Sequence, residues 1–238
     1  VALTTAQWSA LTTEQLQSLT TTQFGTIETA DLVALTTDQV QALATDQLDA
    51  LSTQHFAALD TDQVSALTTE QVESLRTAAL RALTTRQMQV LGSAQFDALT
   101  SAQLQAFSTT QLTALTTEQL ATLSAEQLST FTTTQFNGLS SEQIESLTTD
   151  QVAGLETAQV AGLTTGTLGT LTAEQVASLT TAQIQALTSA SVAALSTGQV
   201  GALTTDQVTA LVTGQVAALS TDSLQALSND QLTSLMTT

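Results

Sequence analysis

The chain has no cysteine, no proline, no tyrosine and no lysine, and it has a single histidine, His55. Without cysteine it cannot be stabilised by disulfide bonds. Cysteine, tyrosine and lysine are also unavailable as nucleophiles or proton donors, so His55 is the only side chain suited to acid–base work near neutral pH. The composition therefore predicts a protein that is not an enzyme, with no catalytic, cofactor-binding or metal-binding residues.

Positive charge is almost absent. Three arginines face 21 acidic residues, which gives a formal net charge of -18. Such a surface repels phosphate backbones and anionic lipid headgroups, which argues against nucleic acid and membrane surfaces as partners. No apolar run approaches the ~20 residues of a membrane-spanning helix, so we expect no membrane insertion.

What the chain does contain is one eight-residue unit, repeated in register from Leu3 to Leu235 in about thirty copies. The unit reads Leu-Thr-Thr-x-Gln-(Val/Leu/Phe)-x-Ala, and its positions are called places one to eight here, starting from the Leu. A short strict period predicts a one-dimensional array in which each unit packs on its neighbours. We therefore expect one uninterrupted array over residues 1–238. Because the sequence starts and stops inside a unit, we also expect it to be a fragment of a longer array.

Neither a continuous helix nor a flat strand fits a period of eight. Eight residues advance a helix by about 800°, so the Leu row would drift by about 80° per unit and form no stable seam. In a flat strand, places one and six would face opposite sides. A β-solenoid could bend between them, and Thr and Val favour strands. Its corners, however, normally need Gly, Asn, Asp or Pro at a fixed place. A β-solenoid remains the alternative.

Places two and five match the capping box. In this motif the side chain of a Thr or Ser accepts a hydrogen bond from the backbone N–H of the third helical residue, and the side chain of a Gln at that third position accepts one from the backbone N–H of the capping residue. Place two is Thr, Ser or Asp in most units, and place five is Gln in nearly all. Negative charge at the second helical position is stabilised by the helix dipole. Acidic residues gather at that position, place four, as Glu14, Asp38, Asp46, Asp62, Glu70, Glu118, Glu126, Glu142, Asp150, Glu174, Asp206, Asp222 and Asp230.

These features predict an all-α solenoid, a superhelix with one very short capped helix of about six residues per repeat. Place six and the place one of the next octad, three residues apart, would face the interior, and places four and seven would face solvent. A helix this short is unstable alone, so neighbouring units must stabilise it. Since glycine occupies no fixed place, we expect the corners to need no left-handed residue.

Exceptions to the repeat give further expectations. His55 lies at place five, where its imidazole could replace the hydrogen bond of Gln. The residues at place five that should make weaker joints are Asp31, Ala79, Thr167, Ser191 and Ser223, and those that break the pattern at the capping place are Arg76, Gly92 and Val212. Bulky residues that should be interior are Trp8, Phe24, Phe56, Phe96 and Phe136 at place six and Phe107 and Phe131 at place one.

Few residue groups could carry chemistry. A Ser52–His55–Asp60 arrangement would need a hydrogen-bonded fork around the imidazole, and we favour a structural role for His55. A haem or transition-metal site needs several ligands, whereas His55, Met88 and Met236 lie far apart in the array. Carboxylates could bind Ca²⁺ weakly, but no Asp-x-Asp-x-Asp-Gly loop is present.

Two surface features remain. The paired Thr of places two and three would form rows that could bind ice or a glycan, although we expect Thr chiefly to cap helices. Arg76, Arg81 and Arg86 form the one basic cluster, and we expect a local salt-bridged patch around Glu73 more than a docking site.

Tandem copies of Ala-Leu-Thr-Thr-Asp-Gln-Val, at residues 34–40 and 202–208, resemble the octapeptide tracts of very large bacterial exoproteins, which are often labelled adhesins or "heme utilization" proteins. The resemblance covers the whole chain. It implies an extracellular or cell-surface location and a role as fibre, stalk or matrix. It does not imply haem chemistry, because the chain lacks ligands for haem.

Taken together, the sequence predicts a structural repeat that acts as an acidic stalk, spacer or filament segment, with self-association into a fibre or matrix. The alternative is a binding module that uses the Thr rows or the acidic face for a glycan, ice or Ca²⁺.

Overall fold

The computed structural model describes residues 3–235, and within that range every regular element is an α-helix and no strand occurs. The all-α solenoid is therefore confirmed over its β alternative. The chain separates into two compact units, Val1–Thr122 and Leu123–Thr238. The octad register continues through the boundary in the sequence, and the single array over residues 1–238 stays a prediction.

Each octad supplies one helix. The helices of the first unit are α1 (Thr5–Ser9), α2 (Thr13–Gln17), α3 (Thr21–Phe24), α4 (Thr29–Val33), α5 (Thr37–Ala42), α6 (Thr45–Asp49), α7 (Thr53–Ala58), α8 (Thr61–Ala66), α9 (Thr69–Ser74), α10 (Thr77–Ala82), α11 (Thr85–Gln89), α12 (Ser93–Asp97), α13 (Ser101–Ala106), α14 (Thr109–Thr113) and α15 (Thr117–Thr122).

The second unit repeats the same plan. Its helices are α16 (Ala125–Ser129), α17 (Thr133–Asn137), α18 (Ser141–Glu145), α19 (Thr149–Ala153), α20 (Thr157–Ala161), α21 (Thr165–Thr170), α22 (Ala173–Ser178), α23 (Thr181–Ala186), α24 (Ser189–Ala193), α25 (Thr197–Gly201), α26 (Thr205–Ala210), α27 (Thr213–Val216), α28 (Thr221–Gln225) and α29 (Asn229–Leu235).

The capping box starts most of these helices, as the sequence predicts. In α9, Thr68 is extended at φ -73° and ψ 161°, its hydroxyl accepts from the Gln71 N–H at 3.1 Å, and its own N–H donates to Gln71 Oε1 at 2.8 Å. The helix ends at Ser74, and the next residue, Leu75, is already extended at ψ 135°. The corner is therefore two extended residues, places one and two, and not the capping Thr alone. No described residue has a positive φ, so the corner needs no glycine, as expected.

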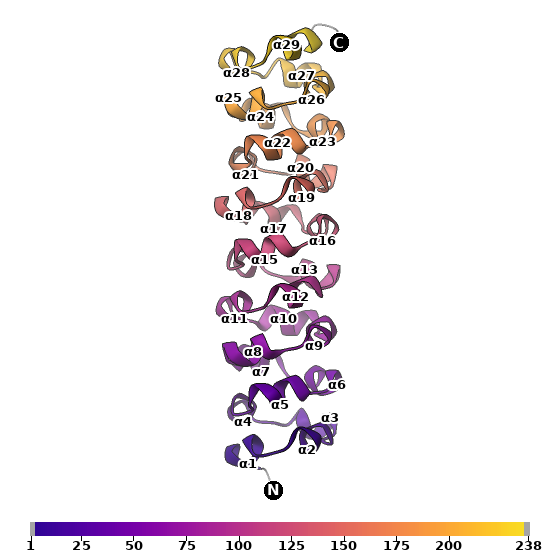
Figure 1. Cartoon of the computed structure of the whole chain (residues 1–238), viewed down its shortest axis with the longest axis vertical. Helices are drawn as coiled ribbons and strands as arrows, with labels where there is room; N and C mark the ends of the chain where they lie inside the picture. Colours follow the sequence, from indigo (N-terminus) through magenta and orange to yellow (C-terminus); the bar gives the residue numbers. More distant parts are fainter. Residues whose placement is uncertain (1–2, 236–238) are drawn as a thin grey trace. The chain divides into compact units, whose positions relative to one another are not determined.

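Successive helices wind into a coil within each unit, as Figure 1 shows. Within each unit, most helices pack on the third helix that follows them. Such contacts link α2 to α5 and α5 to α8 in the first unit, and α19 to α22 and α20 to α23 in the second. Between three and four octads thus complete one turn of the coil, and each turn rests on the one before it.

The interior consists of the two apolar places. Leu and its aromatic replacements at place one and Val, Leu or Phe at place six are buried through most of both units. The predicted bulky residues are interior, because Trp8, Phe24, Phe56, Phe96, Phe107, Phe131 and Phe136 are all 7% exposed or less. Places four and seven face outward in most octads, as expected.

Candidate functional site

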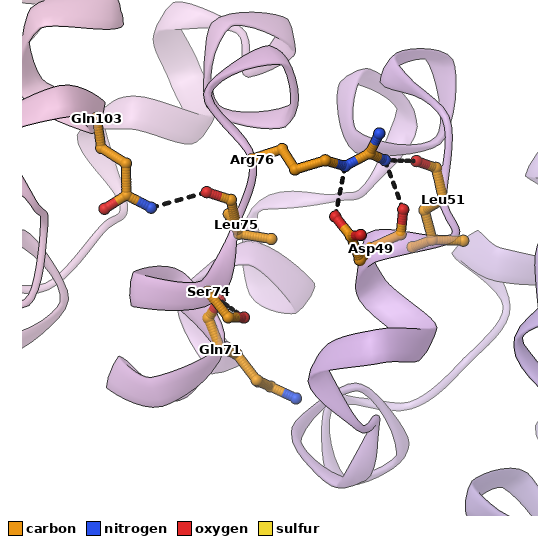
Figure 2. A network of polar contacts seen from close by, with 7 residues as sticks. All are labelled: Asp49, Leu51, Gln71, Ser74, Leu75, Arg76 and Gln103. Atoms are coloured by element: carbon orange, nitrogen blue, oxygen red, sulfur yellow. Dashed lines mark hydrogen bonds and ion pairs between the residues drawn. The ribbon is translucent and has the colours of Figure 1, made fainter.

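The row of glutamines at place five is the main structural device of this protein. Gln103 shows the pattern. Its Oε1 accepts the N–H of Thr100 at 2.8 Å and so caps α13. Its Nε2 donates to the carbonyl oxygen of Leu75, 28 residues earlier, at 2.8 Å (Figure 2). It also donates to that of Val72, 31 residues earlier, at 3.0 Å. One amide therefore closes a helix start and joins two turns of the coil.

The same bond recurs along both units. In each case Nε2 donates to the place-one carbonyl 28 residues earlier. In the first unit the pairs are Gln39–Leu11, Gln47–Leu19, Gln63–Leu35, Gln71–Leu43, Gln87–Leu59, Gln95–Leu67, Gln111–Leu83 and Gln119–Leu91. In the second unit they are Gln151–Leu123, Gln159–Phe131, Gln175–Leu147, Gln183–Leu155, Gln199–Leu171, Gln207–Leu179, Gln215–Leu187 and Gln231–Leu203.

These glutamines are buried, which the sequence did not predict. Gln63 and Gln175 are 2% exposed, and Gln183 is 1% exposed. Carbonyls at a helix end lack partners inside the helix, and a buried amide must bond on both sides. The Gln row meets both requirements at once. The capping box in the sequence predicts the bond that the glutamine Oε1 accepts. The carbonyl to which Nε2 donates lies a whole turn away, so it could not be predicted from the repeat.

Place eight lies where consecutive turns approach closely. A Cβ added to Gly154 would stand 2.5 Å from Ala125 Cβ, and one added to Gly162 would stand 2.6 Å from Thr133 Cγ2. In other octads a Ser or Thr at place eight returns its hydroxyl to the helix, as Ser74 Oγ does in donating to the Gln71 carbonyl at 2.7 Å (Figure 2). Close approach of the turns thus explains the small residues at this place.

His55 takes over the capping role of the glutamine and lies against the preceding turn at Ile27. Its Nδ1 accepts the Ser52 N–H at 3.2 Å, and the backbone of Ile27, 28 residues earlier, influences the titration of the ring. Burial lowers the pKa of His55, and the backbone of Ile27 opposes that shift. Because Nδ1 must be unprotonated to accept, the joint requires neutral imidazole. The predicted replacement of the Gln hydrogen bond is confirmed.

The Ser52–His55–Asp60 grouping does not form a nucleophilic fork. The Ser52 hydroxyl accepts the backbone N–H of His55 at 3.4 Å, and Asp60 Oδ1 accepts the N–H of Gln63 at 2.7 Å. Ser52 and Asp60 therefore cap α7 and α8, and His55 lies against the preceding turn. Met88 is buried in the core with no exposed surface, and Met236 lies outside the described residues.

Arg76 replaces the side-chain amide donor that is missing at Ala79. Its Nη2 donates to the carbonyls of Asp49 at 2.5 Å and Leu51 at 3.0 Å, and its Nε pairs with Asp49 Oδ1 at 2.5 Å (Figure 2). Leu51 lies 28 residues before Ala79 and is the carbonyl that a Gln there would have reached. The expectation of a salt-bridged patch around Glu73 was wrong in its partner, because the ion pair joins Arg76 to Asp49 on the preceding turn.

Thr167 is supported in a comparable way by Asn137. The N–H of Thr164, which a Gln at place five would have capped, donates to Asn137 Oδ1 at 2.9 Å, 27 residues earlier. Asn137 Nδ2 donates in turn to the Gly162 carbonyl at 2.9 Å. The Thr167 hydroxyl itself pairs only with that of Thr164, at 2.9 Å. Here the side chain that joins the two turns belongs to the preceding turn, whereas at the glutamines it belongs to the following one.

The other place-five exceptions differ among themselves. Asp31 accepts from the Thr5 hydroxyl at 2.8 Å, across one turn. Ser191 and Ser223 bond the capping hydroxyls of Thr188 and Ser220 in their own octads, and in the described part of the chain they make no bond to the preceding turn. The expected weakness of these joints stays a prediction. From the geometry we expect the weakest joints at Ser191 and Ser223.

Octads without a capping hydroxyl keep half of the capping box. The N–H of Gly92 donates to Gln95 Oε1 at 2.7 Å, and the N–H of Val212 donates to Gln215 Oε1 at 2.9 Å. The glutamine therefore holds the corner even where place two contributes no side-chain acceptor.

The acidic residues of place four lie in the first turn of their helices, as predicted. In Glu14, hydrogen bonding to its own backbone N–H, followed by the Thr12 hydroxyl, holds the pKa of the carboxyl below its usual range. Such stabilisation of the charged form is what the positive end of a helix provides. Among residues 3–235 no three His, Cys, Asp or Glu side chains gather closely enough to hold a metal ion.

Two further properties concern possible partners. Within the described range, no helix has the length and apolar character needed to cross a lipid bilayer. The place-two hydroxyls are largely occupied in capping, as at Thr68 and Thr100, so place three supplies the free part of the Thr rows. Binding of ice, a glycan or Ca²⁺ stays a prediction.

Comparison with known proteins bears on the whole array. The ALTTAQ repeat model matches seven overlapping segments, residues 24–61, 45–77, 73–101, 93–125, 125–157, 152–189 and 181–213. These matches run without a gap from residue 24 to residue 213. The chain belongs to the ALTTAQ repeat family. The ALTTAQ segments contain most of the capping boxes and inter-turn glutamines described above. No curated protein matches the chain.

Proposed function

We propose that this ALTTAQ array is a non-enzymatic structural element, an extended acidic stalk, spacer or filament segment of a bacterial cell-surface or extracellular protein. The observation that carries the proposal is the inter-turn bond, which uses the same two places in octad after octad. A solenoid whose turns are joined by one repeated bond gains length by adding copies, without a new core.

Charge supports the same role. A net charge of -18 with acidic residues on the outward place four keeps neighbouring arrays apart and in solution. Irregularities at place five are repaired by Arg76 and Asn137 within the coil and do not assemble a reactive site. The extracellular location rests on the resemblance to bacterial exoprotein tracts and on the lysine-free, acidic composition.

Small-angle X-ray scattering of the dilute chain tests the proposal. A compact chain of this length would have a radius of gyration of about 18 Å. We expect a clearly larger value, together with a scattering curve that yields a constant cross-section along a rod. A radius of gyration near that of a compact globule would refute the role as a stalk or spacer.

A further inference from the structure

Asn137 and Gly138 form the only Asn-Gly pair of the sequence. An asparagine in this context is chemically labile, because the backbone nitrogen of the next residue can attack its side-chain Cγ. Glycine favours the attack, since it has no Cβ to obstruct ring closure and its backbone is the least restricted. Asn137 is the last residue of α17, so a reactive bond lies at the end of this helix.

Asn137 also joins two turns at an octad that has no glutamine. Its Oδ1 accepts the Thr164 N–H at 2.9 Å, and its Nδ2 donates to the Gly162 carbonyl at 2.9 Å. Thr167 stands at place five of the later octad, and among the described residues its hydroxyl bonds only that of Thr164. The amide of Asn137 therefore supplies the hydrogen bonds that a place-five glutamine supplies elsewhere.

The folded chain restrains the attack in several ways. Asn137 is helical, and ring closure requires its backbone to leave helical angles. The attacking nitrogen is engaged, because the Gly138 N–H donates to the carbonyls of Thr134 and Gln135, both at 3.1 Å. The amide under attack is held at both its oxygen and its nitrogen by the following turn. All these restraints are released together only when the end of α17 opens locally.

We propose that Asn137 is a site of spontaneous covalent modification, a deamidation that releases the joint between the two turns. When the end of α17 opens, the Gly138 nitrogen loses its proton and bonds to Asn137 Cγ, the Cγ–Nδ2 bond breaks, and Nδ2 leaves as ammonia. Water then opens the succinimide ring at either of its carbonyls, which gives aspartate or isoaspartate. Amide and water thus become carboxylate and ammonium, and no oxidant or reductant is needed.

Both products weaken the joint. Each lacks the Nδ2 donor to the Gly162 carbonyl. Aspartate keeps an oxygen for the Thr164 N–H, but its second oxygen is repelled by the Gly162 carbonyl oxygen. Isoaspartate adds a carbon to the main chain between residues 137 and 138 and so disturbs the eight-residue spacing. Because Thr167 cannot replace the lost bonds, the two turns lose this link. The inference goes beyond the stalk role and does not depend on it.

Mass spectrometry of the full 238-residue chain tests the reactivity. Digestion at Glu126 and Glu142 releases residues 127–142, whose mass rises when OH replaces NH₂. We expect Asn137 to react at least about tenfold faster in guanidinium chloride than in buffer at the same pH and temperature, because the restraints are lost on unfolding. The rate in buffer should rise steeply toward the melting transition. Asn229, which precedes Asp230, is the internal control and should react more slowly in the unfolded chain.

Two variants separate the reactivity from the joint. Gly138→Ala introduces the usual residue of place eight and should slow the reaction of the unfolded chain several-fold. Asn137→Gln should abolish it, because the longer side chain would have to close a larger ring. It keeps an amide at place seven, where Gln17 donates to the Ala42 carbonyl, 25 residues later, at 2.7 Å. Asn137 and Gly162 have the same spacing.

The melting temperature reports the loss of the joint. Wild type that has been deamidated in guanidinium chloride and refolded should melt at least about 2 °C below the untreated protein. Asn137→Gln carried through the same treatment should melt like its untreated form, which controls for every other effect of the incubation. Circular dichroism verifies that each refolded protein is helical.

Equal rates in buffer and in guanidinium chloride overturn the proposal, because the fold would then not govern the reaction. An unfolded chain in which Asn137 reacts no faster than Asn229 overturns it too, as does the absence of any reaction near the melting transition. If complete deamidation leaves the melting temperature unchanged, Asn137 does not hold the two turns together and the proposal fails.

Discussion

The guanidinium of Arg76 donates to the carbonyl oxygen of Leu51 at 3.0 Å, across one turn of the coil. That carbonyl is the one left open by the absence of an amide at Ala79. Arg76 and Ala79 both depart from the repeat, and they do so within the same octad. Arg76 supplies the donor that Ala79 lacks. The irregular octad thus keeps the inter-turn joint by a different donor.

Removing Arg76 should therefore open this joint. We expect Arg76→Ala to lower the free energy of unfolding by about 1–2 kcal/mol, because the Leu51 carbonyl loses a charged donor. The partner side chains are 52% and 54% exposed, so Asp49→Asn should cost less than about 0.5 kcal/mol. Calorimetric melting of the variants gives both values. Arg76→Thr with Ala79→Gln restores the regular joint and should recover the loss, and failure to recover would contradict the pairing.

The two roles of the glutamine can be separated by a single substitution. In Gln103→Glu an oxygen still caps α13, but the donor to Leu75 is lost and a charge is buried among carbonyls. We expect a loss of at least about 2 kcal/mol near neutral pH. The loss should shrink on acidification, when the protonated carboxyl can donate again.

Gln15→Glu is the control for that prediction. Gln15 has the same capping bond but makes no inter-turn bond among residues 3–235, so this change should cost less than about 0.5 kcal/mol. Equal losses for Gln103 and Gln15 in denaturant unfolding would show that capping, and not the inter-turn bond, carries the energy.

Acid should weaken the joint at His55. Its folded pKa is lowered, chiefly by burial, so the unfolded chain binds the proton more readily. The stabilising contribution is complete above the ordinary pKa of about 6.5, and it is lost as the pH falls through the lowered folded value. We expect His55→Gln to remove this dependence. The measurement is the difference in melting temperature between wild type and variant, which should change between about pH 7.5 and pH 5, and a constant difference would exclude the effect.

Spacing between turns predicts opposite effects for two glycines. Gly154→Ala should destabilise the chain by about 1–3 kcal/mol, because the new Cβ would lie 2.5 Å from Ala125 Cβ. Gly169, inside α21, has no atom within 4 Å of an added Cβ. Gly169→Ala should stabilise by about 0.5–1 kcal/mol through helix propensity. Thermal unfolding that shifts in the same direction for both variants would contradict this account of place eight.

Much of the local structure could be predicted from the repeat. The capping box at Thr68 and Gln71 depends on residues three apart, and the burial of Phe96 follows from its place in the octad. The partner of Arg76 could not be predicted in the same way. Glu73 is closer in sequence, but the winding of the coil brings Asp49 alongside instead.

The sequence by itself determined the eight-residue period, the helix starts, the apolar interior and the acidic exterior, because each depends on contacts within one octad or on a repeated composition. Tertiary structure alone decided that a turn takes between three and four octads. With that number, the Leu75 carbonyl lies beneath Gln103, the Leu51 carbonyl beneath Arg76, and Asn137 beside Thr164. Residues some 28 positions apart meet only after the coil has closed one turn, and the pitch of that coil comes from the packing of whole helices and not from any single octad.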